Sequence, residues 1–191
     1  EEELARRRRA EHELEALERQ ESLVLDNTVE IIAHYDTDMM VQWANKAYLR
    51  ETGRTLSEGQ GTKCYEARGY SEMCEACPVP AAIETRCPQE AELSSQTQQN
   101  WPAERGCWLA RAAPVTDEEG RVTGAVEVAH DITERQEAKQ ALQYRLEFEE
   151  LISRLSTEFI NVPLDSIDRR ILVALASVGQ FVRADRAYVF Q

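Results

Sequence analysis

The sequence VTGAVEVAHDITERQ, residues 122–136, joins two different local patterns. Its first part is rich in β-forming residues and follows the turn-forming TDEEGR, which predicts the last strand of a sheet. At Asp131 the pattern becomes helical, and no Gly or Pro follows until Pro163. Thr133 followed by Gln136 fits a capping box at the start of this helix. The stretch therefore predicts a strand that passes directly into a long, stiff helix.

Four further stretches of β-forming residues precede this strand. Residues 29–36 and 40–45 flank the turn-forming DTDM, and residues 89–95 and 107–115 flank a polar loop. Between these pairs, residues 46–88 contain short helical pieces broken by glycines and prolines. We therefore expect an α+β domain with a five-stranded sheet and short flanking helices. Long irregular stretches in compact domains tend to carry function, so residues 46–88 are the first place to look for a site.

Long polar helices are predicted on both sides of this domain. Residues 1–24 and 134–160 lack Gly and Pro and consist largely of strong helix formers. Apolar residues recur in both at heptad-like positions, which predicts that each helix packs against another helix. These residues are Ala10, Leu14, Leu17 and Val24 in the first helix and Ala138, Ala141, Phe148, Ile152 and Leu155 in the second. We expect coiled-coil-like helices that join two copies of the chain in a homodimer.

The charge and cysteine content argue against several classes of protein. The 191 residues carry a formal net charge of −13, so nucleic acids and anionic membranes would be repelled. No apolar stretch approaches the roughly 20 residues that cross a bilayer, and the charged N-terminus has no signal-peptide pattern. Five cysteines without a secretory signal favour a reducing compartment. We expect a cytoplasmic protein that binds no nucleic acid and has no membrane segment in this chain.

Three stretches resemble PAS domains. VQWANKAYLRETG, residues 41–53, is similar to the PAS pattern in which the second strand runs into an Asn-x-Ala helix start. DITER, residues 131–135, resembles the junction at the end of many PAS domains. GTKCYEARGYSEMCEACPV, residues 61–79, resembles a cysteine-containing PAS subgroup of bacterial sensor kinases and diguanylate cyclases. The resemblance implies a PAS fold with a five-stranded antiparallel sheet over residues 25–133, and a sensory role.

The C-terminal residues 161–191 resemble the opening of a GAF domain and end in the similar ADRAYVF. The two resemblances imply part of a larger sensor, in which residues 1–24 are a signalling helix and residues 134–160 are a coiled-coil linker. They favour a dimeric regulatory module of a bacterial histidine kinase, with the sensor region of a diguanylate cyclase as an alternative. No ATP-site, cyclase or P-loop motif is present, so we expect no catalysis in this chain. A ligand-free PAS dimerisation platform is the competing interpretation.

Four cysteines have a spacing that suggests metal binding or thiol redox chemistry. Cys64, Cys74, Cys77 and Cys87 follow the pattern C-x9-C-x2-C-x9-C, which supplies enough thiolates for tetrahedral zinc or an iron-sulfur cluster. Alternatively, Pro78 or Pro80 at a helix start would place Cys77 near a positive helix end and lower its pKa, which favours a redox-active dithiol. The third interpretation is that these are small buried side chains. Cys107, on a predicted strand, is expected in the core.

Other cofactors have weaker support. His12, His34 and His130 all lie outside the helix after the cysteines, where haem-binding PAS domains usually place their ligand, so we expect no haem. His130 shares a strand face with Val126 and Val128 and could point inward. The Asn-Cys-Arg-Phe segment of flavin photosensors is missing, so flavin is not expected either. A small-molecule pocket would be lined by four aromatic residues, although such residues are more often core: Trp43, Tyr48, Tyr65 and Trp108.

Asp131, Ile132 and Thr133 form the junction at which the last strand passes into the long helix. Asp131 or Thr133 would cap the helix and set the angle at which it leaves the sheet. Because the helix continues unbroken, a small shift of the sheet would tilt or rotate the helix against its partner in a dimer. We therefore expect these three residues to transmit the signal.

Overall fold

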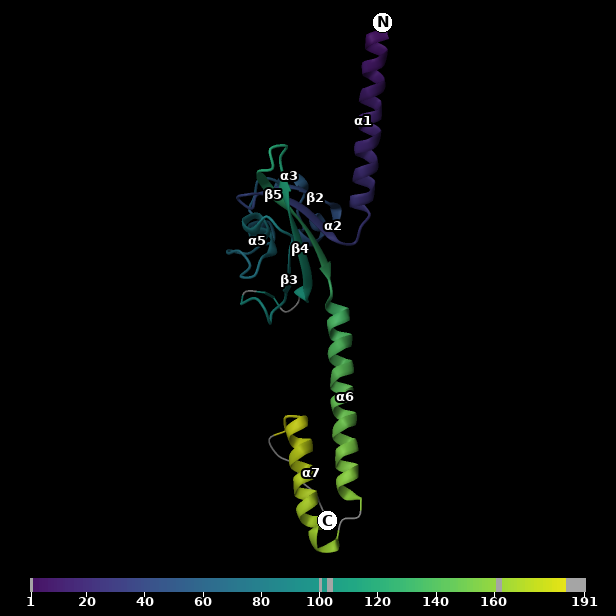
Figure 1. The fold of residues 1–191 in the computed structure, drawn as a ribbon, viewed down its shortest axis with the longest axis vertical. Helices are drawn as coiled ribbons and strands as arrows, with labels where there is room; N and C mark the ends of the chain where they lie inside the picture. The colour runs from purple at the N-terminus through teal and green to yellow at the C-terminus, as the bar shows by residue number, and fades with distance from the viewer. Residues whose placement is uncertain (1, 100, 103–104, 161–162, 185–191) are drawn as a thin grey trace. The chain divides into compact units, whose positions relative to one another are not determined.

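The computed structural model of the protein describes residues 2–99, 101–102, 105–160 and 163–184, in two compact units that divide after Thr133. The first unit is built on one antiparallel sheet with the strand order β2-β1-β5-β4-β3 (Figure 1). All five strands lie where the stretches of β-forming residues predict them. They are β1 Ile31–Asp36, β2 Val41–Ala44, β3 Gln89–Leu93, β4 Trp108–Thr116 and β5 Val122–Asp131.

Short helices separate β2 from β3, as expected for the irregular stretch. They are α2 Lys46–Thr52, α3 Leu56–Gly59, α4 Cys64–Ala67 and α5 Pro78–Thr85, and the first unit begins with the long helix α1 Glu2–Asp26. Buried Asn45 caps α2, since its side-chain oxygen accepts from the Tyr48 amide at 3.1 Å. The same side chain accepts from the Ile32 amide and donates to the Leu25 carbonyl oxygen. One residue thus holds together the end of α1, strand β1 and the start of α2.

The inner face of the sheet carries mainly small residues. Ala110, Ala112, Ala125 and Ala129 are at most 2% exposed. In contrast, Val126 and Val128 are half-buried on the opposite face of β5, where they pair with His34 and Ile32 of β1. From the sequence alone, the face that carries these large β-branched residues would be expected to face the core. Alanine faces the core instead because α5 packs closely on β4 and β5, and large tyrosines from other elements fill the remaining space.

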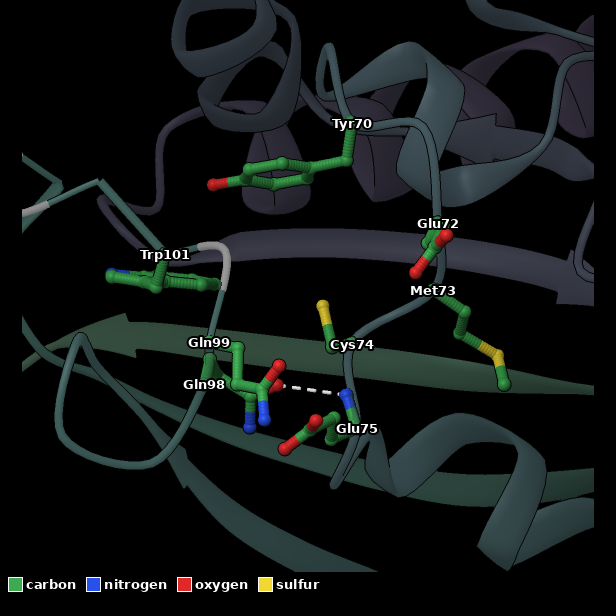
Figure 2. Close-up of a pocket in the computed structure, with 8 residues that line it drawn as sticks. All are labelled: Tyr70, Glu72, Met73, Cys74, Glu75, Gln98, Gln99 and Trp101. Carbon is green, nitrogen blue, oxygen red and sulfur yellow. Dashed lines mark hydrogen bonds between the residues drawn. The ribbon is translucent and has the colours of Figure 1, made fainter.

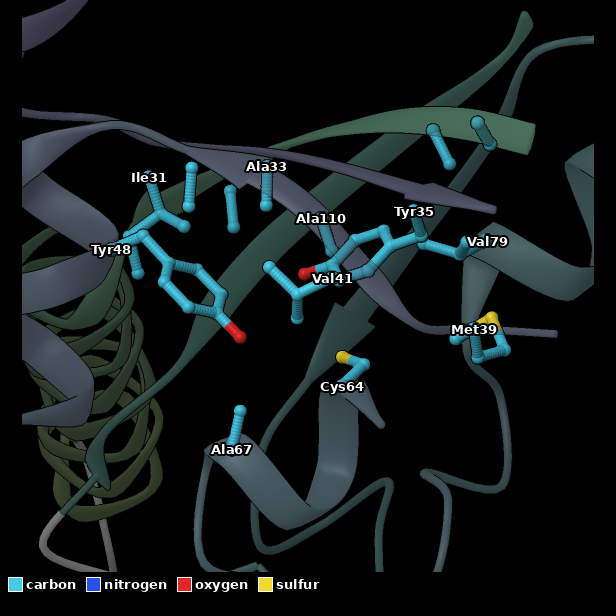
Figure 3. Packing of buried hydrophobic residues seen from close by; sticks show 14 of the residues in the cluster. Ile31, Ala33, Tyr35, Met39, Val41, Tyr48, Cys64, Ala67, Val79 and Ala110 are labelled. Carbon is cyan, nitrogen blue, oxygen red and sulfur yellow. The ribbon is translucent and has the colours of Figure 1, made fainter. Parts of the chain in front are cut away.

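Two of these tyrosines dominate the interior. Tyr35 of β1 and Tyr48 of α2 are at most 1% exposed and lie among small apolar neighbours such as Val41 and Ala67 (Figure 3). Burial raises the pKa of Tyr48 to about 12, because the phenolate would be desolvated. The hydroxyl groups of both tyrosines are therefore protonated and neutral in the interior.

The second unit contains α6 Thr133–Phe159, a short 3-10 helix η2 Leu164–Ser166 and α7 Ile167–Phe181. Within it, Tyr144 and Phe148 of α6 pack on Phe181, with ring centroids 5.0 and 5.8 Å apart. From its sequence alone, the amphipathic helix α7 would be expected to close at Gly179, and that expectation is wrong. The helix continues to Phe181, and Arg183 adopts the left-handed conformation that ends it.

The strand expected in RAYVF, residues 186–190, lies outside the described residues. Among the residues that the structure describes, no helix is both long and apolar enough to cross a membrane. Both long helices, α1 and α6, carry exposed apolar side chains on otherwise charged surfaces.

Candidate functional site

The four cysteines of the sequence motif lie in different environments. Cys64 on α4 is buried, Cys74 and Cys77 are half-buried, and Cys87 is exposed. In the described part of the chain, no group of three or more His, Cys, Asp or Glu side chains converges as a possible metal site. The structure therefore brings Cys64, Cys74 and Cys77 near the core but does not assemble a four-cysteine cage. Cys107 is half-buried rather than in the core.

The predicted lowering of the Cys77 pKa is wrong, although the predicted helix start is present. Pro78 is the first residue of α5 and Cys77 is its N-cap. Burial nevertheless raises the pKa of Cys77, and the Glu127 carboxylate adds to the rise. Burial also raises the pKa of Cys74, and it raises that of Cys64 to about 11. Desolvation thus outweighs the helix terminus, and these thiols stay protonated at neutral pH.

Reaction of the native protein with a thiol reagent at pH 7.5 is therefore expected to modify exposed Cys87 first. A Cys64 pKa of about 11 instead of 9.0 lowers the thiolate fraction about 100-fold, so Cys64 should react at least about 100-fold more slowly than in the unfolded chain. Its rate should rise with pH up to about 11. Mass spectrometry of peptides after timed labelling would measure each site. Labelling of Cys74 and Cys77 as fast as Cys87 would contradict this burial-controlled chemistry.

The aromatic residues predicted to line a pocket are not brought together. Tyr48 is a core residue, and Tyr65 and Trp108 are half-buried. Trp43 pairs with His34 on the outer face of the sheet, away from the core, so it cannot line a cavity on the inner side. Trp108 Nε1 donates to the Arg105 carbonyl oxygen at 2.8 Å.

A small cavity of about 80 Å³ lies instead between the loop before α5 and the segment after β3. Figure 2 shows Cys74 with its thiol pointing toward the rings of Tyr70 and Trp101. These two rings are stacked, with centroids 6.2 Å apart. The sequence reasoning missed both residues, and a lone tryptophan in the polar loop QTQQNWPAERG was the available signal. Among the residues that the structure describes, the cavity is lined by Tyr70, Glu72, Met73, Cys74, Glu75, Gln98, Gln99 and Trp101.

An ion pair lies inside the core next to this cavity, and the sequence reasoning missed it too. Arg68, at the end of α4, donates to Glu127 of β5 at 2.7 Å, with side chains only 8% and 3% exposed. The Tyr35 hydroxyl donates to the same carboxylate oxygen at 2.7 Å. Arg68 Nε and the Tyr48 hydroxyl are buried without a hydrogen-bond partner among the described residues. This pair connects the helical side of the domain to the last strand.

The three junction residues are held by a tight set of hydrogen bonds. Asp131 Oδ1 accepts from the Thr133 amide at 2.9 Å and from its hydroxyl at 2.5 Å. Thr133 Oγ1 accepts from the Cys107 amide at 2.9 Å, and buried Ile132 donates its amide to the Cys107 carbonyl oxygen at 2.8 Å. A side chain at Gly106 would meet Thr133 Oγ1 at 2.1 Å, so only glycine allows this approach.

The segment that holds the junction is hydrogen-bonded to Trp101, which lines the cavity. Trp101 Nε1 donates to the Gly106 carbonyl oxygen at 2.9 Å. Arg105 donates to the Arg68 carbonyl oxygen at 3.3 Å, and its guanidinium lies 5.8 Å from the centroid of the Trp101 ring. Residues 105–107 are thus hydrogen-bonded to a cavity residue, to the backbone of the ion-paired Arg68 and to the first residue of α6.

The histidines lie away from the interior of the sheet. His34 is on the outer face. His130, for which the sequence left an inward orientation open, is exposed, with Nδ1 3.6 Å from a carboxylate oxygen of Glu30. The valines of β5 define this outer face together with His130. His12 is exposed on α1.

A comparison with protein families agrees with this architecture. A family model described as PAS fold matches residues 25–137, which is more than half of the chain. A comparison with curated protein sequences found no match. Among solved structures, a PAS domain from Colwellia psychrerythraea is 16% identical, with a TM-score of 0.46, and the match covers 62% of this chain and 98% of that one. The PAS domain of Bordetella pertussis BvgS is 20% identical, with a TM-score of 0.44, and the match covers 68% and 96%.

A sensory box sensor histidine kinase from Vibrio cholerae is similar at 14% identity, with a TM-score of 0.44 and coverage of 65% of this chain and 98% of that one. The matched family model spans the sheet, its short helices and the Asp131–Thr133 junction. The chain therefore belongs to the PAS fold family.

Proposed function

We propose that this chain is the sensory and regulatory module of a cytoplasmic bacterial signal-transduction protein, with a histidine kinase as the first candidate. The observation that carries this proposal is the junction, where hydrogen bonds of Cys107 reach both Ile132 and Thr133. A displacement of the Gly106–Cys107 segment would change these bonds at the first residue of α6. Because α6 is a single unbroken helix, the change would be passed to whatever its far end contacts.

In this proposal two copies pair through α1 and α6. Apolar side chains of the predicted seams are exposed within one chain, which leaves them available to a second copy. Leu14, Leu17 and Val24 are 56–64% exposed on α1, and Phe148 and Ile152 are 44% exposed on α6. Residues 161–191 would begin a GAF domain, with α7 as one of its helices. The sensor region of a diguanylate cyclase is the alternative setting for the same module.

Replacing Thr133 by proline is expected to uncouple sensing from output. Proline is tolerated at the first position of a helix, so α6 should form, while the hydrogen bonds of Thr133 to Asp131 and Cys107 are lost. In a chimera that joins this chain to a histidine kinase core, autophosphorylation should change several-fold. Thr133→Ser, which keeps the hydroxyl, is the matched control.

The oligomeric state of the chain alone, together with the kinase activity of the chimera, tests the proposed dimer. Sedimentation equilibrium should give a dimer for the chain at about 100 μM. A strictly monomeric chain, together with unchanged kinase output in Thr133→Pro, would exclude the proposed mechanism.

A ligand-free dimerisation platform is the second candidate, and the small cavity volume and raised thiol pKa values favour it. Cavities that hold drug-sized ligands have about 300–1,000 Å³. Metal analysis and a thiol count on anaerobically purified protein separate the candidates. Zinc or an iron-sulfur cluster at Cys64, Cys74, Cys77 and Cys87 would require these side chains to move together from their present positions. Bound metal or a Cys74–Cys77 disulfide would favour sensing through sulfur.

A further inference from the structure

Residues 105–107, which we call the strap, lie immediately before β4 and are held in place by other segments of the domain. Each of the three carbonyl oxygens of the strap accepts a hydrogen bond from outside it. The donors are Trp108 Nε1 for Arg105, Trp101 Nε1 for Gly106 and the Ile132 amide for Cys107, at 2.8, 2.9 and 2.8 Å. The strap itself contains no large apolar side chain. Its position therefore depends on these bonds more than on packing.

The Arg105 side chain connects the strap to the helical side of the domain. Its Nη2 donates to the Arg68 carbonyl oxygen at 3.3 Å, and its Nε lies 3.7 Å from a carboxylate oxygen of Glu51 in α2. The guanidinium also lies 4.9 Å from the centroid of the Tyr70 ring and 5.8 Å from that of Trp101. Because the Arg105 side chain is only 18% exposed, water screens these contacts only in part.

Trp101 contacts the strap at two points. Its indole nitrogen donates to the Gly106 carbonyl oxygen, and its ring lies beside the Arg105 guanidinium. The same ring stacks on Tyr70, and both rings line the cavity shown in Figure 2. A displacement of the Trp101 ring would therefore weaken two contacts of the strap at once.

The other end of the strap lies directly against the first residue of α6. The Cys107 amide donates to Thr133 Oγ1 at 2.9 Å. Gly106 comes so close that a Cβ there would lie 2.1 Å from the same oxygen. The strap therefore has no room to move toward Thr133. It can move only away from Thr133, and such a movement would break the bond from the Cys107 amide.

We propose that Arg105 is a positioning residue that holds the strap against Thr133. Release of its guanidinium from Glu51 and from the two aromatic rings lets the strap move away from the junction. The inference rests on the sensory function proposed above, because it names the contact through which the helical side of the domain acts on α6. The position of the strap can be measured in the chain alone, so the two proposals can fail separately.

Replacing Arg105 by glutamine is expected to loosen the strap, because the charge and the planar contact with the rings are lost together. Hydrogen exchange measured by NMR on the uniformly ¹⁵N-labelled chain would follow the Trp101 indole and the Cys107 amide, which are both bonded within this contact. Both should exchange about 3- to 30-fold faster, which is the range expected for the loss of a partly buried cation–π contact. The amide of Ala33, in the centre of β1, should keep its exchange rate.

Three further variants control this measurement. Arg111→Gln removes an exposed arginine that pairs with Glu90 on β3, so it should change neither exchange rate by more than about twofold. Gly106→Ala forces the strap away from Thr133 whatever Arg105 does, so its Cys107 amide should exchange at least as fast as in Arg105→Gln. Arg105→Lys keeps the charge but loses the planar stacking, and it replaces Arg105→Gln if that variant does not fold. Its exchange rates should rise as well.

Unchanged exchange at Trp101 and Cys107 in Arg105→Gln would overturn the inference. An equal acceleration at Ala33 or in Arg111→Gln would overturn it too, since the effect would then be general destabilisation. In the kinase chimera, Arg105→Gln should change autophosphorylation in the same direction as Thr133→Pro and add nothing to it, because both act through the same bond. Faster exchange at the strap with unchanged autophosphorylation would support the role of Arg105 and count against the sensory function.

Discussion

Glu127→Leu is expected to destabilise the PAS domain by about 3–5 kcal/mol, because it leaves the Arg68 guanidinium buried without its counter-charge. The substitution also removes the acceptor of the Tyr35 hydroxyl, which lies in the same dry interior. Urea unfolding followed by far-UV circular dichroism would measure the change in the free energy of unfolding. Breaking one side of such a pair is costly because the remaining charge has no water to solvate it.

The double variant Arg68→Met/Glu127→Leu is the control for this prediction. Removing both charges at once leaves no unpaired ion, and well-packed apolar replacements of buried pairs are often neutral or stabilising. The double variant should therefore recover at least half of the loss. If it were as unstable as Glu127→Leu alone, the cost would come from lost packing at position 127 or from the Tyr35 hydroxyl, which both variants leave without its acceptor, and the buried-charge explanation would be wrong.

Gly124→Ala is expected to be the second severe substitution, with a loss of about 3 kcal/mol or more. An added Cβ would lie 1.9 Å from the Tyr35 carbonyl oxygen and 3.0 Å from the Asp36 Cα. Because these neighbours are backbone atoms of the paired strand, no rotamer change can relieve the clash. The pairing of β1 with β5 would have to open at this point.

The matched control for this prediction is Gly59→Ala, since a Cβ at Gly59 meets no atom within 4 Å. Its effect on stability should be within about 1 kcal/mol, and favourable if anything, because alanine is the better helix former. Thermal unfolding of both variants would measure the difference. Equal melting temperatures for the two variants would show that β1 and β5 are not in contact at Gly124.

The strands and helices were largely predictable because they depend on local patterns. Stretches of β-forming residues between turn residues located all five strands, and the change of pattern at Asp131 located the start of α6 to within two residues. Asn45 was predictable as the start of a helix because its side chain caps the helix locally. The end of α7 was not predictable, because a glycine such as Gly179 is compatible with both a helix interior and a helix end.

The candidate site was much less predictable because it depends on contacts between distant segments. Sequence spacing singled out Cys74 and Cys77, and one of them, Cys74, lines the cavity. Their chemistry depends on burial, which reversed the expected direction of the Cys77 pKa. Trp43 was a reasonable candidate for a pocket, but strand pairing with His34 places it on the outer face.

The amino-acid sequence by itself determined the order of the elements and the direct passage from β5 into α6, because hydrophobic periodicity, turn residues and caps act over a few residues. Only the tertiary structure decided which face of β5 is inside. Alternation along a strand defines two faces but does not say which one is buried. Glu127 turns inward because Arg68, far away in the sequence, supplies its counter-charge, and the neighbouring alanines leave room for α5.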